Sequence, residues 1–151
     1  MSLRFPYQTI PVGHSVVPLG GRWIRPRPIV AVSIFGPMSS RVRYAILDTA
    51  ADDTVFRETL AMQIGLDLSK APTGVGSGVG MGNIPLRYAQ VHLRLTDGVE
   101  QREWSAWVGF TSAPLRQPLL GFAGFLQFFD VVIRGEKEEV ELTVNGTYPG
   151  S

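Results

Sequence analysis

The sequence contains no cysteine, which excludes disulfide bonds, thiol catalysis and cysteine-ligated zinc or iron–sulfur centres. Histidine is nearly as scarce, with only His14 and His92 in 151 residues. The two do not have the H-x-x-x-H spacing of a histidine metal site, and no G-x-S-x-G nucleophile elbow accompanies them. We therefore expect neither a metal site nor a cofactor, and no serine-hydrolase triad.

A strong charge of one sign and a long apolar run are also missing. The formal net charge is +1, which gives no basis for a nucleic-acid or membrane footprint. No apolar stretch approaches the roughly 20 residues of a membrane span. The first six residues lack the basic and apolar regions of a signal peptide. We expect a cytoplasmic protein with no nucleic-acid or membrane partner.

Glycine and proline, by contrast, are abundant, at 17 and 11 residues. Together with many short aliphatic and aromatic runs, they predict a mostly β chain with many turns, and the length fits one domain. Five of the prolines lie in residues 1–28, where they favour an extended arm or an irregular loop. The remaining residues, 29–151, are the predicted domain.

Strand signals within this domain come in pairs. The β-branched run 29–35 and the run 41–47 predict a hairpin, which should be antiparallel because no crossover helix separates them. Residues 57–64 have the apolar spacing of a short helix, with Gly65 as its C-cap. Further predicted elements are strands at 87–95, 102–110, 130–133 and 138–144 and a short aromatic helix or turn at 122–129.

The hairpin 29–47 runs directly into a group of acids, Asp48, Asp52 and Asp53. One interpretation is structural: Asp48 caps the turn while Asp52 and Asp53 cap the helix that follows. A calcium loop is a second interpretation, but the EF-hand spacing and its closing glutamate are missing. The end of a buried strand is also a common position for a carboxylate that acts as a catalytic acid or base.

Residues 74–82 contain five glycines in nine positions. Such a stretch cannot pack a core, so it is either a plain surface loop or a hairpin that closes over a ligand. Neither the G-x-G-x-x-G nor the G-x-x-x-x-G-K-[ST] pattern fits it, and a nucleotide-binding loop is therefore not predicted.

Residues 47–55, Leu-Asp-Thr-Ala-Ala-Asp-Asp-Thr-Val, resemble the active-site motif of the retropepsin-type aspartic proteases. The core of that motif is hydrophobic-Asp-Thr/Ser-Gly/Ala-Ala-Asp. Two further features follow in the order of the family: the glycine-rich stretch resembles the flap, and Leu119-Leu120-Gly121 precedes a short helix. The resemblance covers about residues 29–144.

The resemblance implies a single-domain closed β-barrel or sandwich with one or two short helices and a flap hairpin. It also implies a homodimer that cleaves a peptide or protein substrate, because the chain carries one copy of the motif and the mechanism needs two. In such a dimer two Asp48 carboxylates share a proton across a two-fold axis. One accepts a proton from water and the other donates a hydrogen bond to the scissile carbonyl, with no covalent intermediate, metal or cofactor.

The resemblance also assigns individual roles. Asp48, with Thr49 and Ala50, would form the catalytic turn, Thr49 bonding across the dimer. The substrate-binding set would be Ala51, Asp52 and Asp53 from the motif and Gly76, Ser77, Gly78, Val79 and Gly80 from the flap. The last strand, residues 138–144, is a candidate dimer element because a terminal strand offers an unpaired edge.

Three features depart from the family pattern. Ala50 stands where many members have glycine, which would cost roughly 1 kcal/mol if that residue needed a positive φ. Phe122 stands where retroviral enzymes carry an arginine that pairs with the acid matching Asp52, leaving Arg57 or Arg116 as substitutes. The N-terminal arm has no counterpart in the short viral enzymes. These departures motivate an alternative function, a non-catalytic dimerisation or peptide-binding module.

Overall fold

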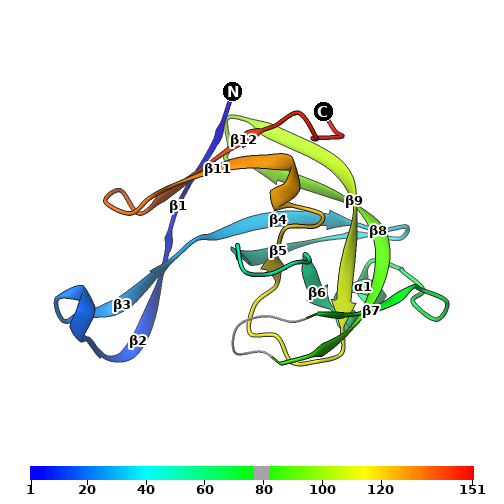
Figure 1. Cartoon of the computed structure of the whole chain (residues 1–151), viewed down its shortest axis with the longest axis horizontal. Coiled ribbons are helices and arrows are strands. Elements are labelled where there is room, and N and C mark those ends of the chain that lie inside the picture. Colours follow the sequence, from blue (N-terminus) through cyan, green and yellow to red (C-terminus); the bar gives the residue numbers. More distant parts are fainter. Residues whose placement is uncertain (77–81) are drawn as a thin grey trace.

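The computed structural model of the chain describes residues 1–76 and 82–151, and strands dominate it (Figure 1). The helical elements are η1 (Val17–Leu19), α1 (Glu58–Gln63) and η2 (Leu126–Phe128). The strands are β1 (Leu3–Pro6), β2 (Gln8–Val16), β3 (Arg22–Arg27), β4 (Ile29–Phe35), β5 (Ser40–Leu47), β6 (Val55–Arg57), β7 (Thr73–Gly76), β8 (Ile84–Thr96), β9 (Gln101–Thr111), β10 (Leu119–Leu120), β11 (Phe129–Arg134) and β12 (Glu139–Val144).

Seven strands form one curved sheet in the order β4-β5-β10-β6-β9-β8-β7. Strand β4 pairs with β5 on one side and with β8 on the other, so six of these strands close on themselves. Closure removes the free edges that an open sheet would expose. The predicted mostly β, closed-barrel fold with few short helices is therefore confirmed.

The local predictions for the barrel are confirmed as well. Strands β4 and β5 form an antiparallel hairpin with Phe35 opposite Ser40. Helix α1 buries Leu60 and Ala61 and ends just before Gly65, whose φ of 85° is the left-handed conformation that favours glycine. The long hairpin of β8 and β9 turns at Asp97 and Gly98, as its sequence predicted.

Trp104 lies at the centre of the core and is almost fully buried. Its ring makes edge-on contacts with Phe125, Phe129 and Tyr148 at centroid distances of 5.6, 5.3 and 6.0 Å. The indole Nε1–H donates to the carbonyl of Gly124 at 3.0 Å, so the polar atom of this buried side chain is satisfied. This contact joins β9 to the segment that follows β10.

A second, three-stranded sheet has the order β1-β12-β11. The expectation that the last strand offers an unpaired edge is wrong, because β12 is the central strand. Residues of the predicted N-terminal arm occupy its edge, with Leu3 opposite Leu142, and β11 covers the other side. The free edges of this sheet belong to β1 and β11.

The predicted arm, residues 1–28, has two parts. Strand β1 belongs to the body of the molecule, since Leu3 and Phe5 are members of the main hydrophobic core. Strands β2 and β3 form a separate two-stranded sheet that stands away from the barrel in Figure 1. Within the described residues, no helix is both long enough and apolar enough to cross a membrane.

Glu141 joins the strands of the three-stranded sheet and makes its stability dependent on pH. The Ser2 hydroxyl donates to Glu141 Oε1 at 2.6 Å, and Arg134 Nη2 lies 2.6 Å from Oε2. These hydrogen bonds lower the pKa of the Glu141 carboxyl. A lowered pKa contributes stability that is present above the ordinary glutamate range and is lost as the pH falls through the folded value.

We expect Glu141→Gln to lower the melting temperature at neutral pH by more than it does at acid pH. Thermal unfolding followed by circular dichroism between pH 3 and pH 7 gives the melting temperatures of the wild type and the variant. A difference between the two chains that stays constant over this range would contradict the assignment.

Candidate active site

The acidic turn, residues 48–54, is held by the segment 120–123, which crosses it after β10. Strand β10 pairs in parallel with β5 and antiparallel with β6, so it lies between the two strands that bound the turn. Four backbone hydrogen bonds join the two segments: Asp48 N to Leu120 O at 3.1 Å, Phe122 N to Ala51 O at 2.9 Å, Ala123 N to Asp52 O at 2.8 Å and Thr54 N to Ala123 O at 3.0 Å. Such a ladder fixes the path of the turn.

Gly121 is the residue that allows this crossing. A Cβ atom at Gly121 would lie 2.2 Å from the Asp53 carbonyl oxygen and 2.7 Å from that of Ala51, both in the backbone. Any side chain would therefore push the crossing segment off the turn. The two matching motifs, 47–55 and 119–121, are thus in contact although they lie about 70 residues apart in the sequence.

Asp48 sits where the barrel strand ends. Leu47 is buried within the core, while Asp48 is half-buried at the rim. The Ala50 N–H donates to Asp48 Oδ1 at 3.0 Å, and the Ala51 N–H donates to the Asp48 carbonyl oxygen at 3.2 Å. One carboxylate oxygen thus closes the turn, as the capping interpretation expected. In the described ranges the other oxygen has no hydrogen bond or ion pair.

Thr49 and Ala50 form the exposed tip of the turn. Among the described residues, the only non-glycine residue with a positive φ is Glu138, so Ala50 does not adopt the conformation that would favour glycine. The methyl group of Ala50 therefore carries no backbone strain, and this departure from the family pattern has no conformational cost.

The other acids of the turn differ in their surroundings. Ala51 is buried, Asp52 is exposed, and Asp53 is half-buried, with its Oδ2 accepting a hydrogen bond from the Tyr88 hydroxyl at 3.3 Å. Burial, followed by the nearby Asp53 charge, raises the pKa of Tyr88. The interpretation of Asp52 and Asp53 as helix caps is wrong. The N-cap of α1 is Arg57, which makes no side-chain capping bond, and strand β6 separates the acids from the helix.

Arg57 was one of two arginines expected to pair with Asp52. It instead donates from both Nε and Nη2 to the carbonyl oxygen of Leu115, the Nε bond being 3.0 Å long. No ion pair of Asp52 or of Arg116 occurs in residues 1–76 and 82–151. The role of Arg57 is thus to hold the loop between β9 and β10.

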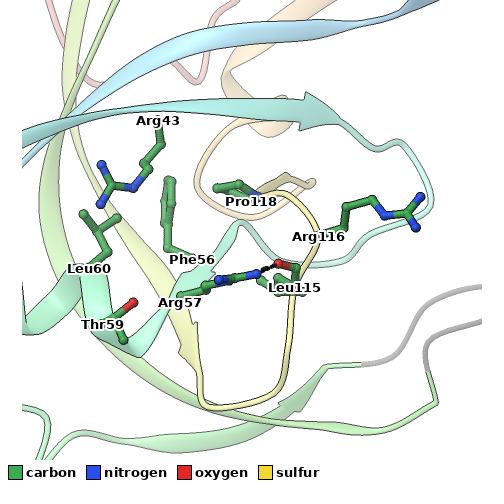
Figure 2. A pocket seen from close by; sticks show the side chains of 8 residues that line it. All are labelled: Arg43, Phe56, Arg57, Thr59, Leu60, Leu115, Arg116 and Pro118. Atoms are coloured by element: carbon green, nitrogen blue, oxygen red, sulfur yellow. Dashed lines mark hydrogen bonds between the residues drawn. The ribbon is translucent and has the colours of Figure 1, made fainter. Parts of the chain in front are cut away.

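A pocket of about 260 Å³ lies beside this contact, and three arginines line it (Figure 2). Arg43 and Arg116 point to opposite sides in Figure 2, while Arg57 lies between them against Leu115. The three guanidinium groups therefore do not converge on one point. The pocket is a basic hollow next to the loop 112–118 rather than a site for a single anion.

Two paired strands, β7 and β8, flank the glycine-rich stretch. Strand β7 pairs antiparallel with β8, from Thr73 opposite Arg87 to Gly76 opposite Ile84. Gly76 is buried, and a Cβ there would lie 3.0 Å from the Ile84 side chain. The remaining predicted flap residues, Ser77, Gly78, Val79 and Gly80, lie outside the described part of the chain.

The base of this hairpin packs on the wall of the site. Ile84 and Leu86 form a small hydrophobic cluster with Val55 and Leu115. Gly74 leaves room for Tyr88, since a Cβ at Gly74 would lie 2.6 Å from its ring. The hairpin is therefore connected to the acidic turn both through Val55 and through the bond from Tyr88 to Asp53.

Sequence reasoning missed two of these contacts. The bond from Tyr88 to Asp53 joins strand β8 to the acidic turn, and the bond from Arg57 to Leu115 joins strand β6 to the loop between β9 and β10. The two segments in each pair meet only in the closed barrel. Neither has a local signal in a single sequence, because a tyrosine or arginine in an alternating strand has the same pattern whether or not it meets a partner.

Comparison with known proteins adds no assignment: no protein-family model matches the chain, and none of the curated proteins matches its sequence. Among the described residues, no group of three histidine, cysteine, aspartate or glutamate side chains is placed to hold a metal ion.

Proposed function

We propose that the chain is a homodimeric aspartic endopeptidase of the retropepsin type, which hydrolyses peptide bonds with one Asp48 carboxylate from each subunit. The observation that carries the proposal is the arrangement of Asp48. It stands at the end of a barrel strand, one oxygen fixed by Ala50 N–H, in a turn bonded to the Leu120-Gly121 segment. The resemblance of residues 47–55 and 119–121 to the family's motifs, and the contact between these two segments, support the same proposal.

The proposed chemistry needs only what two such turns supply. Two carboxylates brought together cannot both ionise without a large repulsion, so they hold one proton between them. The ionised carboxylate removes a proton from a bound water, which attacks the scissile carbonyl carbon. The protonated carboxyl group donates a hydrogen bond to the carbonyl oxygen, where negative charge develops. A proton from the carboxyl pair then passes to the amide nitrogen as the C–N bond breaks, which leaves one carboxyl group protonated and the other ionised.

Each neighbouring residue has a place in this proposal. The exposed Thr49 faces out of the turn and is available to the second subunit. Asp52 and Asp53 lie beside the catalytic acid and would accept hydrogen bonds from substrate backbone N–H groups. Tyr88 orients the Asp53 carboxylate and connects it to the β7–β8 hairpin, which would cover the bound peptide.

The proposal is tested with a peptide library digested by the purified chain, with the new termini identified by mass spectrometry. Mixing the wild type with an equal amount of the Asp48→Asn chain then tests the two-subunit mechanism. If subunits exchange freely, about one quarter of the dimers carry two wild-type subunits, so activity per wild-type subunit falls to about half.

Two outcomes would contradict the proposal. If activity per wild-type subunit is unchanged by the mixing, one Asp48 is sufficient. If the wild type cleaves no peptide although it is dimeric, the alternative of a non-catalytic dimerisation or peptide-binding module is favoured. Peptide retention measured by equilibrium dialysis separates binding from dimerisation alone.

A further inference from the structure

In the described part of the chain, the ribbon formed by β2 and β3 pairs with no other strand, and its contact with the body through side chains is the ion pair from Arg22 to Glu138. The two strands pair only with each other, from Gln8 opposite Arg27 to Val16 opposite Arg22. Between these ends no residue of either strand is fully buried. An isolated two-stranded ribbon is only marginally stable in water, so one of this length is expected to lie against another surface.

One face of this ribbon combines apolar and cationic side chains. Directly opposed residues of an antiparallel pair lie on the same face, which places Ile10 with Arg25. Alternation along β3 puts Trp23 and Arg27 on that face as well. Trp23 is 60% exposed, which is unusual for so large an apolar side chain. Tryptophan and arginine are the residues that most often carry the binding energy of protein–protein interfaces.

Glu138 contacts the ribbon at both ends. The Tyr7 N–H, just before β2, donates to the carbonyl oxygen of Glu138 at 2.6 Å, and at the far end of the ribbon Arg22 Nη1 lies 2.8 Å from Glu138 Oε1. These two contacts give the β2–β3 ribbon a defined direction relative to the body. In Figure 1 it extends from the left of the barrel, the side on which β5 ends and the acidic turn begins. At about 3.3 Å per residue, a nine-residue strand reaches roughly 30 Å, close to the diameter of a small domain.

We propose that the β2–β3 ribbon is an arm that packs on a second copy of this chain. The inference rests on the proposed function, in which the second copy must face the acidic turn to complete the site. The arm extends on that side, and a two-fold axis would repeat the contact from both subunits. Strand β12 has no free edge to supply this interface, since β1 already covers it.

Charge complementarity supports the same occupant. Arg25 and Arg27 form no ion pair in residues 1–76 and 82–151, and neither do the three acids of the turn. If the arm of one subunit lay on the acidic turn of the other, these two arginines would come close to Asp52 there. Asp52 is exposed, and residue 122 of its own subunit is a phenylalanine and cannot pair with it. The arm would then supply a cation beside the active site of the other subunit.

The test measures the dimer dissociation constant by sedimentation velocity for the full chain and three variants. Trp23→Ser and the double variant Arg25→Glu/Arg27→Glu are each expected to raise this constant by about 30-fold, the range of interface hot spots. Trp107→Ser is the matched control, because Trp107 is 55% exposed but lies on barrel strand β9. Since the arm adds little to the core, the melting temperature of the monomer should not change.

Peptide cleavage by the same variants separates this inference from the proposed function. Activity of the arm variants should fall at low protein concentration and recover at high concentration, where the dimer reforms. If the wild type dimerises through the arm but cleaves no peptide, the proposed function is wrong and the inference about the arm still holds. Three outcomes would contradict the inference about the arm. The dissociation constant could be unchanged in the arm variants, it could rise equally in Trp107→Ser, or the wild type could be monomeric at every concentration.

Discussion

Replacing Asp48 by asparagine is expected to lower peptide cleavage by at least about 10³-fold, because an amide can neither accept the proton of the attacking water nor hold the proton shared by the two carboxylates. The same substitution should leave the fold intact. Asp48 Oδ1 accepts a hydrogen bond from Ala50 N–H, and the carbonyl oxygen of asparagine can accept the same bond. The expected effect is therefore on the rate and not on stability or dimerisation.

Asp67→Asn is the matched control for this prediction. Asp67 Oδ1 accepts a hydrogen bond from Ser69 N–H at 2.9 Å, two residues ahead, just as Asp48 does from Ala50. The control thus changes an equivalent turn in another segment of the chain, between α1 and β7. Cleavage of the best library peptide, the melting temperature and the sedimentation coefficient are measured for both variants. More than a tenth of the wild-type rate in the Asp48→Asn chain would exclude the proposed mechanism.

Gly121→Ala is expected to destabilise the chain by about 3 kcal/mol or more. The new Cβ would lie 2.2 Å from the backbone carbonyl oxygen of Asp53, and neither partner is a flexible side-chain end that can move aside. The crossing segment or the acidic turn must then shift, which also displaces Asp48. We expect the free energy of unfolding, measured by urea denaturation, and the cleavage rate to fall together.

Gly146→Ala serves as the control for this prediction. A Cβ at Gly146 would meet no atom within 4 Å, and its φ is not positive. Since the alanine loses less chain entropy on folding, this variant should be neutral or slightly stabilised, by less than about 1 kcal/mol. If the two alanine variants unfold at the same urea concentration, the contact of Gly121 with the acidic turn is not a steric constraint.

Much of the local structure was accessible from the sequence, because it depends on neighbours in the chain. The runs 29–35 and 41–47 are rich in residues that fit strands, and the break between them allows a turn but no crossover helix. Helix α1 and Gly65 follow from apolar spacing and from the conformational freedom of glycine. The strand end that places Asp48 is predictable for the same reason.

The prediction for the last strand failed for a physical reason. A strand near the end of a chain offers a free edge only if no other segment pairs with it, and backbone N–H and C=O groups accept any strand in register. Here the proline-rich start of the chain supplies β1, which pairs with β12 from Leu3 to Pro6. The composition of residues 1–28 does not reveal this pairing, because proline at the end of an edge strand is compatible with a sheet.

The acidic turn shows where local information ends. The amino-acid sequence by itself determined a mostly β chain, a carboxylate at the end of a buried strand, and the chemistries excluded by the lack of cysteine and the scarcity of histidine. Only the tertiary structure decided that Gly121 lies against Asp53, that Tyr88 bonds to Asp53, and that Arg57 bonds to Leu115 instead of to Asp52. Those contacts arise when the barrel closes and brings together turns, loops and strands that are remote in sequence, and local residue preferences carry no information about such pairs.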